Sequence, residues 1–146
     1  MKKINHFING EEYISKSNRF GDVFNPALGE KIADVSFAND KDVGVAIASA
    51  KAAFTSWSST PPLTRSRIMF KFKELLLRDM DMLAAQVTEE HGKVLSDAVG
   101  SVTRGMEVVE FMCGVPHLIK GEFSENVGRN IDSWSMRQPL GICVGI

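Results

Sequence analysis

The segment 140–146 constrains the fold most, because it is almost purely apolar and reads Leu-Gly-Ile-Cys-Val-Gly-Ile. An uncharged run with several β-branched residues is typical of a strand buried on both faces, as found inside parallel sheets. Such a strand needs neighbouring strands and covering helices, yet the sequence ends at Ile146. We therefore predict an α/β fold and expect this chain to be the leading piece of a larger protein.

The composition excludes several classes of protein. The 146 residues are 44% hydrophobic and 24% charged, an ordinary balance for a globular protein long enough to bury a sizeable core. Seventeen basic and eighteen acidic side chains give a net charge of −1, which disfavours nucleic acid as a partner. The sequence contains neither a run of eighteen apolar residues nor a secretory signal, so we expect no membrane contact and a cytoplasmic location.

Turn residues and apolar spacing divide the first two thirds of the chain. Residues 7–37 alternate short apolar pieces with turn signals at Asn9-Gly10 and Asn25-Pro26, a pattern that predicts small strands. Apolar residues at steps of three and four then predict three amphipathic helices. We expect them to begin at Asn39 as N-cap, at Thr60 as N-cap, and at about Asp79, with the third ending at Gly92.

A fourth helix, predicted over about 94–120, has apolar residues on two nearly opposite sides, so we expect other layers to cover both. Pro116 is expected to kink or end it. Arg104 falls in line with Val108 and Phe111 on the second apolar face, where a guanidinium needs an anionic partner. Two partners remain possible: a carboxylate of the protein, such as that of Glu107 or Glu110, or the carboxylate of a small substrate.

Few residues elsewhere point to chemistry. Cys113 and Cys143 lie in apolar surroundings and are expected to be buried, reduced thiols and not nucleophiles. The three histidines have no partners at zinc-ligand spacing, which predicts that the chain has no metal site. The sequence also lacks a G-x-G-x-x-G loop, the usual motif for dinucleotide binding after a strand. Trp134 and Met136 alternate with polar residues and predict a half-exposed strand over 130–138.

Several short motifs resemble, in their order and spacing, the N-terminal portion of NAD(P)-dependent aldehyde dehydrogenases. Within that superfamily, residues 97–111 and 135–143 are most similar to the CoA-acylating methylmalonate-semialdehyde dehydrogenases. The superfamily motifs are Phe7-Ile8-Asn9-Gly10, Phe24-Asn25-Pro26-Ala27 with Gly29-Glu30, Ala52-Ala53-Phe54 with Trp57, Arg65 with Arg67, Glu90-His91-Gly92-Lys93, and Pro139-Leu140-Gly141.

The resemblance implies an arrangement of domains. Residues 1–129 would be the N-terminal strands and helical layer of a cofactor-binding domain. Residues 130–138 would be a strand of the oligomerisation hairpin whose second half is missing, and 139–146 the truncated first core strand of the dinucleotide-binding sheet. The fold would thus be the N-terminal part of an aldehyde dehydrogenase-like fold, with small strands, four helices, one oligomerisation-type strand and one core strand.

The resemblance also implies an activity. Such enzymes oxidise malonate or methylmalonate semialdehyde with NAD, decarboxylate the product and transfer the acyl group to coenzyme A, giving acetyl-CoA or propionyl-CoA. Arg104 matches the arginine of this branch that binds the substrate carboxylate, and Val108 and Phe111 would line the substrate pocket. Homo-oligomers would form from complete subunits.

The resemblance breaks off before the chemistry. In relatives the catalytic cysteine and the Asn-Phe-Pro loop follow the position of Ile146, and neither Cys113 nor Cys143 stands at the nucleophile's place. We therefore expect NAD and coenzyme A to need residues beyond Ile146 and the 146-residue chain alone to be inactive. The alternatives are another aldehyde dehydrogenase of the superfamily or a noncatalytic docking or assembly module derived from one.

Overall fold

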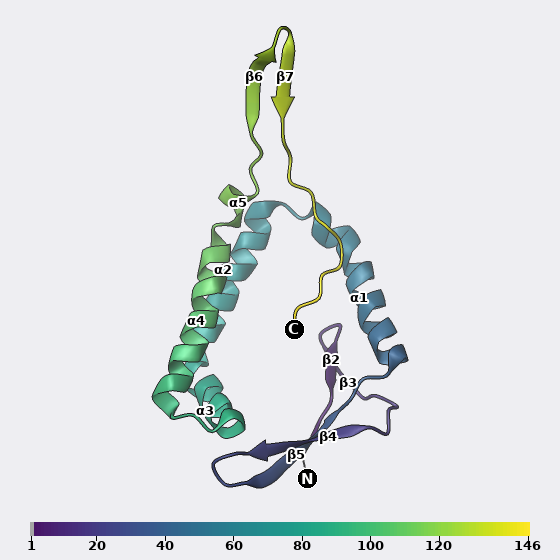
Figure 1. The fold of residues 1–146 in the computed structure, drawn as a ribbon, viewed down its shortest axis with the longest axis vertical. Helices are drawn as coiled ribbons and strands as arrows, with labels where there is room; N and C mark the ends of the chain where they lie inside the picture. The colour runs from purple at the N-terminus through teal and green to yellow at the C-terminus, as the bar shows by residue number, and fades with distance from the viewer. Residues whose placement is uncertain (1) are drawn as a thin grey trace.

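The N-terminal residues form two small sheets (Figure 1). The structure, a computed structural model, describes residues 2–146. One sheet has the order β1-β5-β4, in which β1 is parallel and β4 antiparallel to β5, and the other is the antiparallel β2–β3 hairpin. The strands span Lys2–Ile4 (β1), His6–Ile8 (β2), Glu11–Tyr13 (β3), Phe20–Asn25 (β4) and Glu30–Ser36 (β5). Asn9 and Gly10 turn the hairpin with φ of 56° and 80°, which confirms the tight turn predicted there.

Helix α1, Asp40–Ser59, begins with a reciprocal cap. The Asn39 side chain accepts hydrogen bonds from the backbone N–H groups of Lys41 and Asp42, and the Asp42 carboxylate accepts one from the Asn39 N–H. Both ends of this exchange satisfy backbone donors that a helix start leaves without partners. The predicted N-cap is thus confirmed.

A polar network continues from this cap into the N-terminal strands. The Asp42 carboxylate also accepts hydrogen bonds from Ser15 Oγ at 2.6 Å and from the Tyr13 hydroxyl at 3.1 Å, and Asp42 is only 3% exposed. The hydrogen bond from the Asn39 N–H, followed by that from Ser15, holds the pKa of Asp42 below its usual value. On the three-stranded sheet, Lys31 pairs with Asp22 at 2.7 Å and Asp34 at 2.6 Å.

Helices α2, Pro62–Arg78, and α3, Met80–His91, follow α1. The expected N-cap at Thr60 is wrong by one residue: Thr60 caps the C-terminus of α1, where its N–H bonds to the Trp57 carbonyl, and Pro61 precedes α2. Pro62 is the first residue of α2, and proline suits that position because its missing N–H would have no helical partner. Gly92 ends α3 with φ of 82°, as predicted.

The predicted fourth helix is two helices. Helix α4 spans Leu95–Cys113, and the short α5 spans Val115–Leu118. Gly114 separates them, with its N–H bonded to the Phe111 carbonyl at 3.1 Å. Pro116 has no N–H to continue the α4 ladder, so the break follows from its chemistry.

A hairpin of β6, Phe123–Gly128, and β7, Ile131–Trp134, projects away from the helices (Figure 1). The strand predicted over 130–138 is therefore shorter than expected, and its partner is not missing, because β6 precedes it in the chain. Sequence analysis did not find β6, since its polar residues show no apolar alternation. Asn130 forms part of the turn with φ of 60°.

The core strand predicted over 139–146 is not formed. Residues 139–146 belong to no strand within the described chain, and Leu140 and Val144 are 96% and 83% exposed. No strand among residues 2–146 pairs with this segment, and an apolar sequence alone cannot make a ladder. The segment instead runs beside α1, where Ile142 and Cys143 share a pocket with Trp57.

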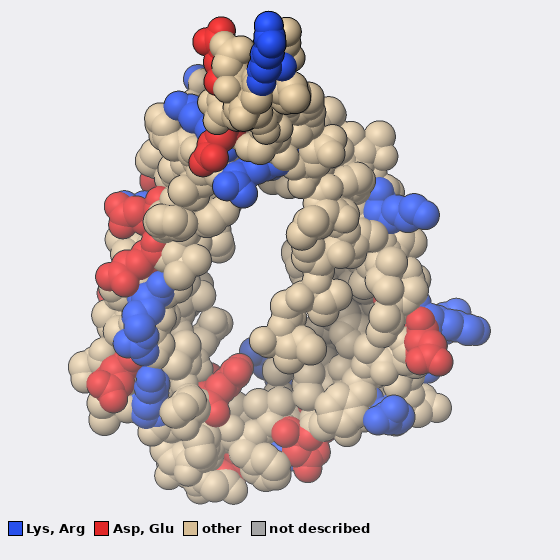
Figure 2. All heavy atoms as spheres, turned by 45° about the horizontal axis from the view of Figure 1, so that its top comes forward, with Lys and Arg blue, Asp and Glu red and all other residues tan. Residues whose placement is uncertain are grey.

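The apolar side chains that are buried within residues 2–146 are all small. Helix α4 packs on α2 and α3, but none of the large side chains described is fully buried, although the chain is long enough for a sizeable core. Figure 2 shows an opening through the molecule between the α2–α4 side and the α1 side, with much of its border uncharged. The buried apolar residues are Ala33, Ala84, Ala98 and Cys113.

Candidate functional site

Helix α4 places the predicted site residues on one face. Arg104, Val108 and Phe111 follow one another at steps of four and three, so their side chains share a side of the helix. All three are exposed, Val108 by 63% and Phe111 by 65%. The opposite stripe, which includes Met106 and Val109, faces α2 and α3. The structure therefore brings the three residues together, on the face that nothing in residues 2–146 covers.

The Arg104 guanidinium lies along its own helix. Its Nη2 donates a hydrogen bond to Ser101 Oγ at 3.1 Å. Its Nη1 lies 3.7 Å from where a Cβ on Gly100 would stand, so the glycine leaves room beside it. The predicted burial of Arg104 is wrong, because the second layer expected over this face is not present in the described chain.

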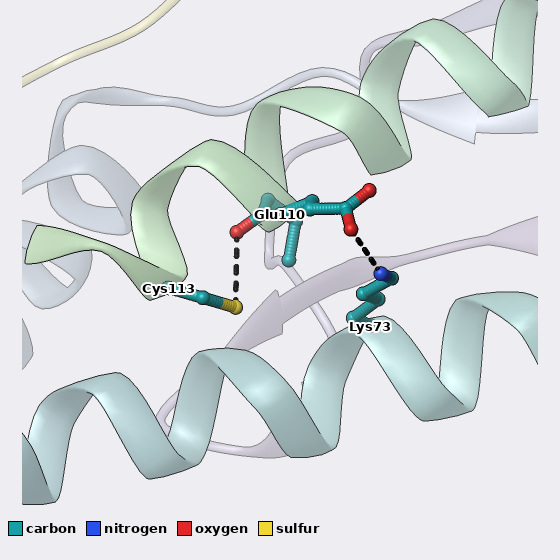
Figure 3. A network of polar contacts seen from close by, with 4 residues as sticks. Lys73, Glu110 and Cys113 are labelled. Carbon is teal, nitrogen blue, oxygen red and sulfur yellow. Dashed lines mark hydrogen bonds and ion pairs between the residues drawn. The ribbon is translucent and has the colours of Figure 1, made fainter.

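The internal ion pair considered for Arg104 is not formed either. Within residues 2–146 Arg104 makes no ion pair, and Glu110 pairs with Lys73 of α2 instead (Figure 3). This pair joins α2 to α4 on the side away from Arg104. The guanidinium therefore remains available to an anion from outside the described chain.

The two cysteines differ in exposure. Cys113 is buried as predicted, and its Sγ contacts the Val109 carbonyl at 3.5 Å on the side of α4 that faces α2 (Figure 3). Its own carbonyl accepts a hydrogen bond from the Ser66 hydroxyl of α2 at 2.6 Å. Cys143, predicted to be buried, is exposed because the segment 135–146 is not covered. Both thiols are free, and neither has a base placed to activate it among the hydrogen bonds of the described residues.

One residue near Arg104 was missed by sequence analysis. Lys93 Nζ donates to the same Ser101 Oγ at 2.8 Å, and Ser101 Oγ donates to the Asp97 carbonyl at 3.2 Å. Lys93 precedes α4, and the left-handed turn at Gly92 sends the chain back so that the lysine reaches the second turn of the helix. In the sequence, only Gly92, which predicts a helix end and a change of chain direction just before Lys93, could have indicated this contact.

The other surfaces of the described chain include one open pocket on the helical side. An open pocket of about 500 Å³ between α2, α3 and α4 is lined by apolar side chains apart from Gln86 and Glu90. In residues 2–146 no group of three metal-ligating side chains lies together, and no helix is long and apolar enough to cross a bilayer. Among residues 2–146, no strand leads through a glycine-rich loop into a helix. The arrangement can bind an anion, but it holds no activated nucleophile.

Solved structures share this fold. A protein described as a methylmalonate-semialdehyde dehydrogenase from Sinorhizobium meliloti 1021, complexed with NAD, matches with a TM-score of 0.92 at 45% identity, over 97% of this chain and 29% of that chain. The methylmalonate-semialdehyde dehydrogenase of Oceanimonas doudoroffii matches with a TM-score of 0.90 at 48% identity, over 96% and 28%. The mixed α/β architecture is thus that of the N-terminal portion of aldehyde dehydrogenases, as predicted.

The sequence gives the same class. Residues 13–146 match the aldehyde dehydrogenase family, and the chain belongs to that family. The malonate-semialdehyde dehydrogenase of Pseudomonas aeruginosa is 45% identical over all of this chain and 29% of its own length. The acylating mitochondrial methylmalonate-semialdehyde dehydrogenase of Arabidopsis thaliana is 42% identical over 99% of this chain and 24% of its own length. The chain therefore spans less than a third of these relatives.

Proposed function

We propose that this chain is the N-terminal portion of an NAD-dependent, CoA-acylating malonate- or methylmalonate-semialdehyde dehydrogenase. The names and the 42–45% identity of the two relatives support the substrate class, and the NAD complex of the Sinorhizobium protein supports the cofactor. The domain arrangement remains a prediction: residues 1–129 as strands and helical layer, 130–138 in the oligomerisation hairpin and 139–146 in the dinucleotide-binding sheet. NAD and coenzyme A would bind sequence corresponding to the rest of these relatives, and the 146-residue chain alone would be inactive.

Arg104 carries the proposal for this chain's own residues. It is an exposed guanidinium without an ion pair in the described residues, and it stands in line with the exposed apolar Val108 and Phe111. A guanidinium binds a carboxylate through two parallel N–H···O hydrogen bonds, and apolar neighbours suit the short carbon chain of a semialdehyde. Arg104 would thus select an acid semialdehyde over a neutral aldehyde, with Val108 and Phe111 lining the pocket.

The test replaces Arg104 with alanine in the complete gene product. Losing a charge-assisted hydrogen-bond pair should raise KM for malonate semialdehyde by about 10- to 100-fold. KM for propanal, a neutral aldehyde of the same carbon number, should change little. Arg19→Ala is the matched control, because Arg19 is exposed just before β4, away from α4. An equal rise in both KM values would contradict the proposed role.

An assay of the unchanged complete product for NAD reduction and for oligomerisation separates the proposal from a noncatalytic module. The β6–β7 hairpin projects away from the helices, and its side chains Phe123, Ile131 and Trp134 are 57–66% exposed. Exposed apolar side chains on a projecting hairpin support a role in joining complete subunits into a homo-oligomer. A complete product that oligomerises but reduces no NAD with any semialdehyde would indicate an assembly module.

The two free thiols fit a reducing compartment such as the cytoplasm.

A further inference from the structure

One hydroxyl group holds two positive side chains at the start of α4. Ser101 Oγ accepts a hydrogen bond from Lys93 Nζ at 2.8 Å and another from Arg104 Nη2 at 3.1 Å. Its proton goes to the Asp97 carbonyl one turn earlier, at 3.2 Å. A serine hydroxyl has one proton to donate and two lone pairs to accept with. All three are used here, so the hydroxyl is fixed with both lone pairs toward the cations.

The cluster has two positive charges, and neither of them forms an ion pair within residues 2–146. The ion pairs of that range use Lys31, Lys71, Lys73 and Arg78, and neither Lys93 nor Arg104. Two like charges held on one oxygen atom repel each other, and an anion that contacts both removes this repulsion. The cluster is therefore arranged to receive an anion.

Lys31 is an example in this chain of a lysine with a structural role, because carboxylates neutralise its charge. Its ammonium group lies between two carboxylates, those of Asp22 and Asp34, at 2.7 and 2.6 Å. Lys93 is half-buried like Lys31, yet its partner is a neutral hydroxyl that it shares with a second cation. The two sites have opposite charge balance, so the Lys93 cluster is not a second example of the same structural pairing.

We propose that Lys93 and Ser101 determine specificity together with Arg104. Ser101 is a positioning residue, because its hydroxyl holds the Arg104 guanidinium against α4. Lys93 adds a second positive charge that attracts the same substrate carboxylate. This inference rests on the proposed function, since it concerns the carboxylate that Arg104 binds, and it adds two residues that selection of an acid semialdehyde depends on.

The test compares conservative and disruptive variants of both residues in the complete gene product. For each variant, kcat and KM are measured with malonate semialdehyde and with propanal. We expect Ser101→Ala to raise KM for the semialdehyde about three- to tenfold, and Ser101→Thr, which keeps the hydroxyl, to remain close to the unchanged protein. Lys93→Gln should raise it about tenfold, and Lys93→Arg should restore most of the loss because it keeps the charge. Propanal kinetics and kcat should stay within about twofold for all four variants.

The outcomes separate this inference from the function on which it rests. If Arg104→Ala discriminates between the two aldehydes but Ser101→Ala and Lys93→Gln do not, the shared cluster is wrong and the role of Arg104 stands. Equal losses with both aldehydes in the Ser101 and Lys93 variants would show a merely structural role and overturn the inference. If Arg104→Ala itself affects both aldehydes equally, the proposed function fails and this inference fails with it.

Discussion

The helical side and the N-terminal side of the molecule are held together by different forces. In the helical side, α2, α3 and α4 approach closely because small residues lie at their contacts, and Ala84 and Ala98 are both fully buried. In the N-terminal side, the cap of α1 and the strand segments are joined by the polar network around Asp42. The helix contacts depend on the volume of the buried side chains, whereas the polar network depends on the ionisation of Asp42. The two sides should therefore respond to different changes.

The largest effect is expected from Ala98→Leu in α4. Ala98 has no exposed surface, so three added carbon atoms would push α4 away from its neighbours and lower the free energy of unfolding by about 1–3 kcal/mol. The measurement is the urea midpoint of the chain. Leu140→Ala is the control in the exposed C-terminal segment and should change stability by less than about 0.5 kcal/mol. Equal effects would mean that the contrast between packed and uncovered apolar residues is wrong.

An effect of intermediate size on stability is expected where α3 meets the turn between β4 and β5, which is a contact between the two sides. Gly92 ends α3 with φ of 82°, and a Cβ added there would lie 2.7 Å from Pro26 Cγ in the turn between β4 and β5. Gly29 has a similar φ of 71° but nothing within 4 Å of such a Cβ. Both alanine variants lose about 1 kcal/mol to backbone strain, and Gly92→Ala should lose more because Pro26 must also move.

The difference between these two variants measures the contact between α3 and the β4–β5 turn. Thermal unfolding of both variants, compared with the unchanged chain, provides it. If Gly92→Ala and Gly29→Ala lower stability equally, Pro26 moves aside without a cost in the free energy of unfolding. The contact between α3 and the β4–β5 turn would then not be tightly packed.

The smallest effect, and the one that depends on pH, is expected from Asp42→Asn. The pKa of Asp42 is lowered in the folded chain, so its carboxylate stabilises the fold at pH above its unfolded pKa, about 4. That contribution is lost as the pH falls through the lower, folded pKa. An asparagine cannot ionise, so the variant should be less stable at neutral pH and lose less stability on acidification.

Urea unfolding of both proteins at a series of pH values from 7 to 2 measures this contribution. Asp40→Asn is the matched control, because Asp40 lies exposed in the same helical turn and forms none of the hydrogen bonds of Asp42. Parallel stability curves for the unchanged chain and Asp42→Asn would contradict the role given to the network. Ala98→Leu, by contrast, should shift stability equally at all these pH values.

Features set by neighbouring residues could be predicted from the sequence. The cap at Asn39, the turn at Asn9-Gly10 and the helix end at Gly92 each depend on one or two side chains and the adjacent backbone. For the same reason the helical register of Arg104 with Val108 and Phe111 could be predicted, because a periodicity of 3.6 residues fixes it.

Features that depend on a partner distant in sequence could not be predicted from the sequence. The burial of Arg104 and of Cys143 was inferred from apolar neighbours, but burial requires a second layer that residues 2–146 do not supply. The strand over 139–146 does not form within residues 2–146 for the same reason, since a ladder needs a second strand. The contact of Lys93 with Ser101 depends on the direction that the chain takes after Gly92, which apolar spacing does not report.

The hydrogen bond from the Ser66 hydroxyl to the Cys113 carbonyl has a consequence for the order of folding. The last carbonyl groups of a helix lack partners in their own helix, and here one of them is satisfied by a side chain 47 residues earlier. Since synthesis proceeds from the N-terminus, α2 leaves the ribosome before the end of α4 is made. The hydroxyl that satisfies the last carbonyl of α4 has therefore been synthesised before that end of the helix emerges.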